Sequence, residues 1–305
     1  MFPTVFVTGA TGSQGSAVAR QLLEIGWTVR TTARNMDSPA AKKIQDLGAE
    51  VTPGDWDNEE VLKTVISGCT HMFLNLVPNM AASASEVPQA KKIIDIAKSE
   101  GVKHVIYSSG MAIKDMEKDT HHDRDHPIWH AHWRKKEIED LVQNAGFDAW
   151  TILRPGFFMC NTLMPKIKVM SADLLQTNTW RTAYTPEVRL PMMDVEDLAK
   201  FAVAAFREPS RFNGQKIEIA SEKLSPDEIM RQLGEASGRP LSVVYLTGDE
   251  IKAKMNEDFF ISIQLLSRDL GDKVDIGSVK KWDIPLTTYS QFLERERAWV
   301  ESTFA

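Results

Sequence analysis

The chain has 305 residues, of which 43% are hydrophobic and 26% charged, and its formal net charge is −6. This composition is typical of a globular protein with one large domain or two moderate ones. The acidic balance excludes a dedicated nucleic-acid binder, which needs a basic surface to neutralise phosphates. Two cysteines indicate a reducing compartment, and no apolar run approaches the ~20 residues that cross a bilayer. The first residues lack a signal-peptide pattern, so we expect a cytoplasmic protein, with a nuclear location as the alternative.

Strand and helix patterns alternate through the first half of the chain. Runs that favour strands occupy positions 4–8, 28–32, 50–52, 71–76, 103–109 and 150–153. Helical patterns lie between Gly15 and Gly26, Ser38 and Gly48, and Asp57 and Gly68, and at 87–100 and 128–144. Ser38 before a proline predicts one helix cap, and Asp57 with Glu60 predicts a capping box. The alternation indicates parallel βαβ crossovers, hence an α/β fold with a doubly wound sheet.

The alternation weakens after about residue 156. A strong helical pattern covers 194–206, Ser225 opens another helix, and an amphipathic helix is expected over 287–302. We therefore predict a Rossmann-type domain over 1–155 and a smaller mixed α/β lobe over 156–305. Residues of roughly 190–207 are expected to return to the first domain.

Three glycines mark the end of the first strand pattern. Gly9, Gly12 and Gly15 stand between a strand and a helix, with Thr11, Ser13 and Gln14 between them. Glycine lets the backbone approach a pyrophosphate closely, and the following helix N-terminus favours an anion. The spacing in this context predicts a dinucleotide-binding loop. The alternative is a glycine-rich turn without a ligand.

The end of the second strand bears on the choice of dinucleotide. NAD(H) binders usually place an acidic residue about 20 positions after the glycines. This chain instead has Arg34, preceded by Arg30, and no acid before Asp37. A guanidinium binds a 2′-phosphate through two charge-assisted hydrogen bonds. We therefore predict NADP(H), with NAD(H) left open, and with a solvated Arg34 as the alternative.

Several short motifs then follow one another along about two thirds of the chain. They are Gly9–Gly15, Arg30–Asn35, Gly54–Asp55, Ser108–Ser109, Lys135 with Glu139, Arg154–Met159 with Asn161, and Met193–Asp197. In this order they resemble the NmrA-like branch of the atypical short-chain dehydrogenase/reductases. That resemblance implies a Rossmann domain with a small substrate lobe. The branch includes NADP(H)-sensing regulators, quinone and phenylpropanoid reductases, and tailoring enzymes of fungal metabolism.

The resemblance also implies positions for cofactor contacts. Residues 9–15 would bind the pyrophosphate and Arg34 the 2′-phosphate. The remaining contacts would be Asp55 and Trp56 beside the adenine, Asn75 and Leu76 along a ribose, Lys135 near the nicotinamide ribose, and Pro155, Gly156, Phe157 and Phe158 beside the nicotinamide.

The catalytic machinery departs from that of ordinary short-chain dehydrogenases, which place a tyrosine four residues before a lysine. Here Ala131 stands four residues before Lys135. A cofactor carries the hydride chemistry itself, so the proton would come from Lys135, a histidine or water. Ser109, at the end of the fifth strand, is a candidate hydrogen-bond donor to a substrate carbonyl. The alternative is that it only terminates the strand.

Five of the seven histidines lie between positions 121 and 132. His130 and His132 are candidate general acids, because histidine titrates near neutral pH. His126 and His130, four residues apart, suggest a metal pair, but Pro127 and the lack of an acidic partner argue against it, so no metal is expected. The simplest interpretation is a solvated loop and helix start.

Two classes of function therefore fit the sequence, and a third stays open. The first is an NADPH-dependent oxidoreductase that reduces an apolar aromatic, quinone or enone-type small molecule. The second is a non-catalytic NADP(H) sensor that contacts a protein partner, such as a transcription factor. The third is a dehydratase or isomerase on the same fold. No nucleic acid or membrane is expected as a partner.

Overall fold

The computed structural model describes residues 2–76, 86–114, 116, 127–255 and 258–305. The chain forms two compact units. Unit 1 comprises Met1–Ile113, Trp129–Arg154 and Leu198–Ile217, and unit 2 comprises Lys114–Ile128, Pro155–Asp197 and Glu218–Ala305. The segment that returns to unit 1 is therefore 198–217, whereas the sequence suggested 190–207.

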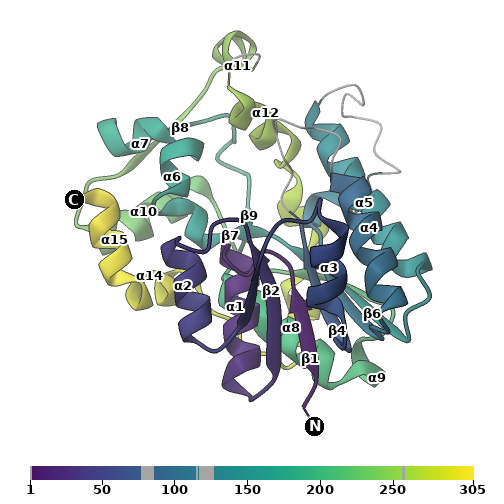
Figure 1. Cartoon of the computed structure of the whole chain (residues 1–305). Coiled ribbons are helices and arrows are strands. Elements are labelled where there is room, and N and C mark those ends of the chain that lie inside the picture. Colours follow the sequence, from purple (N-terminus) through teal and green to yellow (C-terminus); the bar gives the residue numbers. More distant parts are fainter. Residues whose placement is uncertain (1, 77–85, 115, 117–126, 256–257) are drawn as a thin grey trace. The chain divides into compact units, whose positions relative to one another are not determined.

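Unit 1 is built on a seven-stranded sheet with the strand order β10-β6-β5-β4-β1-β2-β3. Strands β1, β2, β4 and β6 of this sheet are labelled in Figure 1. Its strands are β1 (Thr4–Val7), β2 (Thr28–Ala33), β3 (Glu50–Pro53), β4 (His71–Asn75), β5 (His104–Ser108), β6 (Ala149–Pro155) and β10 (Gln215–Ile219). β1 to β6 pair in parallel, which confirms the expected doubly wound sheet. The order reverses where β1 lies between β2 and β4. Ligands of such sheets bind at this switch point, beyond the carboxyl ends of the strands.

The helices of the first half follow the predicted pattern. They are α1 (Ser13–Glu24), α2 (Pro39–Asp46), α3 (Glu59–Ile66), α4 (Glu86–Ser99), η1 (Met111–Ile113) and α5 (Pro127–Asn144), followed later by α8 (Val195–Arg207) and α9 (Pro209–Phe212). Ser38 caps α2 as predicted, since its side chain accepts the Ala41 N–H. The cap predicted for α3 was wrong. The Asn58 side chain, not that of Asp57, accepts hydrogen bonds from the Glu60 and Val61 N–H groups. The Asp57 carboxylate instead accepts a hydrogen bond from the Gln89 side chain of α4.

Helices α3, α4 and α5 share a buried cluster with one face of the sheet. Leu62 and Ile66 of α3, Ile93 of α4 and Ile138 of α5 lie in this cluster with Tyr107 of β5. Strand β10 was not predicted, because its alternating sequence QKIEI lies in a region where the strand–helix alternation had faded.

Unit 2 has a three-stranded sheet of order β11-β9-β7 and a two-stranded sheet of β12 and β8. These strands are β7 (Phe157–Phe158), β8 (Thr179–Thr182), β9 (Leu190–Met193), β11 (Glu222–Leu224) and β12 (Ser242–Tyr245). Its short helices are η3 (Met159–Thr162), α6 (Lys166–Met170), α7 (Ala172–Thr177), α10 (Pro226–Ser237), α11 (Gly248–Lys254), α12 (Phe259–Leu266), η4 (Leu270–Lys273), α13 (Ile276–Lys280), α14 (Tyr289–Arg295) and α15 (Arg297–Phe304).

Two predictions for unit 2 can be compared with its helices. Ser225 forms a capping box with Glu228 at the start of α10, as its sequence pattern suggested. The prediction of a single helix over 287–302 was wrong. Helices α14 and α15 are separated at Glu296, whose φ and ψ of −95° and 24° are not helical. Among the described residues, no helix combines the length and apolar character needed to span a membrane.

Candidate functional site

The glycine loop joins β1 to α1 at the switch point of the sheet. Gly9 has a φ of 64°, a conformation that favours glycine. Gly15 lies in the first turn of α1, and a Cβ atom there would stand 2.3 Å from the Gly9 carbonyl oxygen. Helix and loop therefore approach each other so closely that no side chain fits at Gly15. This is the close packing that a dinucleotide-binding turn requires.

The N-terminus of α1 has no side-chain cap. Gly12 is its N-cap residue, and no acidic residue lies in its first turn. Thr11 is exposed and Ser13 half-buried, beside the uncapped end. The first N–H groups of a helix lack partners within the helix, and its dipole favours an anion. The loop and α1 together form a cradle suited to phosphate.

Hydrogen bonds tie this loop to the ends of two neighbouring strands. The Thr8 hydroxyl accepts the Asn75 N–H at 2.6 Å and lies 3.0 Å from the Asn75 carbonyl oxygen. The Ser108 hydroxyl donates to Gln14 Oε1 at 2.6 Å. The structure thus brings together Gln14, Asn75 and Ser108, which come from three separate parts of the sequence. Leu76 follows Asn75, but its side chain is buried in the core, so only its backbone can border a ligand.

Two further predicted cofactor contacts lie after β2 and β3. Arg34 is exposed, directly after β2, and no hydrogen bond or ion pair joins it to another described residue. The Asp55 carboxylate is engaged within its own loop, where it accepts the N–H groups of Asp57 and Asn58 at 3.0 and 3.2 Å. Trp56 is half-buried against the core of unit 1. Arg34 is therefore available to a ligand, whereas Asp55 is partly committed to its turn.

Lys135 lies on α5 next to the end of β5. A Cβ atom placed on Gly110, two residues after β5, would stand 3.8 Å from the Lys135 Cδ. Lys135 is thus close to the edge of the sheet that also carries Ser108. Its side chain is only 17% exposed, and its Nζ lies 3.7 Å from Glu86 Oε1. Burial lowers the pKa of Lys135, and the nearby Glu86 carboxylate opposes that shift.

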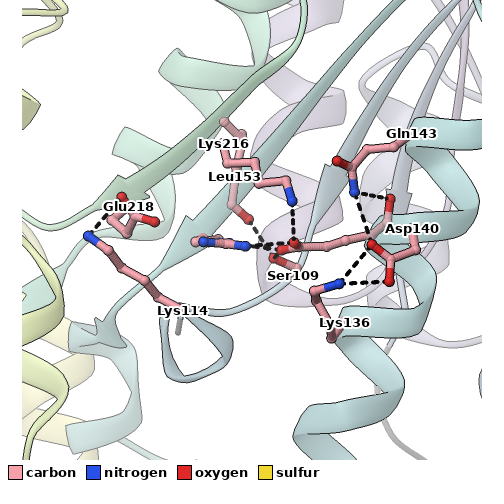
Figure 2. A network of polar contacts seen from close by, with 10 residues as sticks. Ser109, Lys114, Lys136, Asp140, Gln143, Leu153, Lys216 and Glu218 are labelled. Atoms are coloured by element: carbon pink, nitrogen blue, oxygen red, sulfur yellow. Dashed lines mark hydrogen bonds and ion pairs between the residues drawn. The ribbon is translucent and has the colours of Figure 1, made fainter. Parts of the chain in front are cut away.

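Ser109 belongs to a different buried network, which Figure 2 shows around the labelled Ser109 and Lys216. The Ser109 hydroxyl donates to Glu139 Oε1 at 2.7 Å. Arg154 holds the same carboxylate with two hydrogen bonds, from Nε to Oε1 at 2.9 Å and from Nη2 to Oε2 at 2.7 Å. Lys216 adds an ion pair at 3.7 Å. The Ser109 hydroxyl is therefore engaged with a buried ion pair that connects α5 with β6, and its catalytic role stays a prediction.

The histidine-rich segment is described only in part. His121, His122 and His126 lie outside the described residues, so the suggested His126–His130 pair lies outside them as well. His130 is exposed on the first turn of α5, and His132 is half-buried on the same helix. Within the described ranges, no group of three or more histidine, cysteine or acidic residues could hold a metal ion. The general-acid hypothesis for His130 and His132 stays a prediction.

The last predicted contacts lie at the start of unit 2. Pro155 ends β6, and Phe157 and Phe158 form β7, which pairs in parallel with β9. A Cβ atom on Gly156 would stand 2.3 Å from the Pro191 carbonyl oxygen, so this glycine permits close strand packing. Phe157 and Phe158 are half-buried against the core of unit 2. Their proposed place beside a nicotinamide stays a prediction.

Sequence reasoning missed two buried residues of unit 1, the Glu86 that pairs with Lys135 and the Tyr107 of β5. Glu86 is the first residue of α4, and its side chain is 3% exposed. An acidic residue at a helix N-terminus is usually explained as a surface group that interacts with the helix dipole, so nothing in the sequence indicated that Glu86 is buried. Tyr107 was set aside as a strand residue. Its hydroxyl is buried without a hydrogen-bond partner among the described residues, and burial raises its pKa, with the Glu86 and Glu139 carboxylates adding to the shift.

A family model described as the NmrA-like family matches residues 1–282. The chain belongs to the NmrA-like family. This confirms the resemblance drawn from the ordered motifs.

The curated relatives of this chain include proteins that are named as enzymes. An NAD(P)H azoreductase of Xenophilus azovorans is 29% identical over 255 residues, covering 82% of this chain and 80% of the relative. An NmrA-like family domain-containing protein of Dictyostelium discoideum is 25% identical over 312 residues, covering 97% of this chain and 98% of its own length. Several other relatives are named oxidoreductases, among them one of Aspergillus flavus that is 25% identical.

Solved structures share the fold. The negative transcriptional regulator NmrA, in complex with NADP, superposes with a TM-score of 0.75 at 19% identity, covering 99% of this chain and 97% of that one. An NADPH-dependent quinone oxidoreductase from Escherichia coli, complexed with NADPH, gives a TM-score of 0.73 at 20% identity, covering 95% and 99% of the two chains. At these identities the likeness establishes the fold, and the fold class predicted from sequence is confirmed.

Proposed function

We propose that this protein is an NADPH-dependent reductase of an apolar aromatic, quinone or enone-type small molecule. The observation that carries the proposal is that an uncapped phosphate cradle after β1 and a largely buried lysine beside the end of β5 lie at the carboxyl ends of one sheet, with β4 between them. The family supports a dinucleotide cofactor, and the names of its azoreductase and quinone oxidoreductase relatives support reduction.

The residues of this chain fit such a cofactor. The close approach of α1 to the glycine loop at Gly15, together with the uncapped N-terminus of α1, suits a pyrophosphate. The exposed guanidinium of Arg34 suits a 2′-phosphate, which favours NADP(H) over NAD(H). When bound, the cofactor supplies a hydride. We assign the proton that the reduced substrate needs to Lys135, whose side chain lies beside Gly110, just after the carboxyl end of β5.

A non-catalytic NADP(H) sensor is the second candidate function. One specific observation favours it, namely the likeness in fold to a transcriptional regulator that binds NADP. The sensor and the reductase share the cofactor cradle and differ in the need for Lys135. Turnover therefore separates them, whereas cofactor binding does not.

The test of cofactor choice is a titration with NADPH and NADH, followed by intrinsic tryptophan fluorescence, in the parent protein and in Arg34→Ala. Hydrogen bonds to charged groups contribute roughly 1.5–3 kcal/mol, so we expect Arg34→Ala to weaken NADPH binding by about 10- to 150-fold. NADH affinity should change little. Equal NADPH affinity in both proteins would contradict the role of Arg34.

The test of catalysis is NADPH consumption with a panel of quinones, enones and azo compounds. We expect turnover in the parent protein and a large loss in Lys135→Met, with NADPH affinity reduced much less than the rate. Arg20→Ala provides a surface-charge control, because Arg20 pairs with Glu24 at the far end of α1. NADPH binding without turnover of any compound would favour the sensor.

A further inference from the structure

Lys135 has a buried partner of unusual character. The Glu86 carboxylate comes from α4 and Lys135 from α5, and their charged atoms are 3.7 Å apart, longer than a hydrogen bond. Arg134 Nε approaches the other carboxylate oxygen at 4.0 Å. Among the described residues, neither Glu86 oxygen accepts a hydrogen bond. A carboxylate that is 3% exposed thus lies between two cations without being tightly held by either.

A buried carboxylate without close hydrogen bonds is not expected to stabilise the fold. Removing a carboxylate from water is costly unless close hydrogen bonds replace the lost hydration. Two further atoms without hydrogen-bond partners in the described part of the chain are linked to this carboxylate. Arg134 Nε lies 4.0 Å from it, and the Tyr107 hydroxyl has a pKa that burial and the Glu86 charge both raise. The missing hydrogen bonds of the Glu86 carboxylate therefore need an explanation other than stability. A catalytic role is one of the explanations for a buried polar group without a hydrogen-bond partner.

The electrostatics of the pair point to proton handling. Burial raises the pKa of Glu86 and lowers the pKa of Lys135. Each charge opposes the shift of its partner, and the Glu139 carboxylate on α5 also raises the pKa of Lys135. Arg134 lowers the pKa of Glu86. The affinities of the amine and the carboxylate for a proton are thereby brought closer together than in water.

We propose that Glu86 is the proton partner of Lys135 and keeps its buried amine charged and placed to protonate the reduced substrate. This role rests on the proposed function. The Lys135 ammonium gives one proton to the substrate oxygen as the carbonyl carbon gains a hydride, so that a C–H and an O–H bond replace the carbonyl π bond. The pair is left as carboxylate and neutral amine, and it regains one proton from solvent through the partly exposed lysine. Glu86 contacts no substrate and acts as a positioning residue.

The first experiment measures the proton affinity of Lys135 without any cofactor. The rate at which 1-fluoro-2,4-dinitrobenzene labels Lys135 is followed by peptide mass spectrometry across pH in the parent protein and in Glu86→Gln. An opposite charge within 4–6 Å typically shifts a pKa by 1–3 units. We therefore expect the pKa of Lys135 to fall by about one unit or more in Glu86→Gln. An unchanged or higher Lys135 pKa would overturn the proposal.

Asp140→Asn is the matched control for this measurement. The Asp140 carboxylate accepts hydrogen bonds from the neighbouring Lys136 of the same helix at 2.7 and 2.8 Å. Asp140→Asn therefore removes a carboxylate from α5 that is paired with Lys136 and not with Lys135. We expect Lys135 labelling to be unchanged in this variant. Thermal unfolding of Glu86→Gln should show a stability equal to or above that of the parent, which excludes misfolding as the cause of a shift.

The second experiment uses the pH profile of NADPH-dependent turnover. Glu86→Gln should move the basic limb of the kcat profile to lower pH by the same amount as the labelling shift, with NADPH affinity unchanged. Glu86→Asp should recover part of that shift. A labelling shift in a protein without any turnover would sink the proposed function but preserve the pairing. Turnover with an unmoved limb would preserve the function and overturn the role of Glu86.

Discussion

Two buried carboxylates in unit 1 meet their cations in opposite ways. Glu139 of α5 is fully buried, receives two hydrogen bonds from Arg154 and one from Ser109, and connects the helix to β6 (Figure 2). Glu86 of α4 is almost equally buried, but its nearest cation is 3.7 Å away. Both carboxylates act on the pKa of Lys135.

This difference in pairing suggests different roles for the two carboxylates, structural for Glu139 and functional for Glu86. Bidentate guanidinium–carboxylate pairs fix geometry, because two parallel hydrogen bonds leave no freedom of rotation. A loosely paired carboxylate does not fix the positions of its neighbours, but its own protonation can change when the charge on its partner changes. Glu139 therefore holds α5 against the sheet, whereas Glu86 adjusts the group that α5 presents to the strand ends.

The largest expected effect would come from breaking the tight pair. Glu139→Gln leaves Arg154 buried without its counter-charge, and removing one partner of such a pair typically costs about 3–5 kcal/mol. We expect a loss of that size in the free energy of unfolding, measured by urea with circular dichroism. Glu86→Gln should cost nothing or stabilise. Similar losses in both variants would erase the distinction between the two carboxylates.

A second pair of buried groups lies at the opposite ends of the strands. His71 and His104 begin β4 and β5, with ring centroids 5.6 Å apart, and both contact Phe206. Burial lowers the pKa of each from 6.5 to about 4. The folded protein therefore binds fewer protons than the unfolded chain between these values, so its stability falls as pH drops from 6.5 towards 4.

His104→Phe tests this linkage. His104 is 4% exposed, and its Nε2 lacks a hydrogen-bond partner among the described residues. Replacing it should remove about 2 kcal/mol of the acid-induced loss, a value reduced from the full shift because water reaches part of the cluster. Urea unfolding at pH 4.5 and 7 gives the comparison. An identical pH dependence in parent and variant would show that His104 is not kept neutral by the fold.

The sequence predicted features that local rules control. The βαβ alternation, the Gly9–Gly15 turn and the Ser225 cap depend on neighbouring residues, so their patterns could be recognised directly. Lys135 was predicted from the resemblance to its family. The commitment of Ser109 to Glu139, 30 residues away, could not be predicted, because it depends on how α5 packs against β5.

Glu86 and Tyr107 show why the remaining part of the site escaped prediction. A glutamate at a helix start and a tyrosine within a strand both satisfy ordinary local preferences. Their importance comes from burial without partners, which only the packing of α4, α5 and β5 creates. The Tyr-x-x-x-Lys pattern concerns helix positions before Lys135, whereas the tyrosine on which the Glu86 and Glu139 charges act lies in strand β5.

Tyr107→Phe gives the smallest expected effect and the finest test of the loose cluster. The ring is fully buried in the core, and its hydroxyl has no hydrogen-bond partner among the described residues. Removing an unsatisfied polar group leaves the packing intact, so the free energy of unfolding should stay equal or rise by about 1 kcal/mol. The pKa of Lys135 should not move, because the variant changes no charge. A clear loss of stability would show that the hydroxyl is hydrogen-bonded in solution, and would contradict the interpretation of Tyr107 as an unpartnered group.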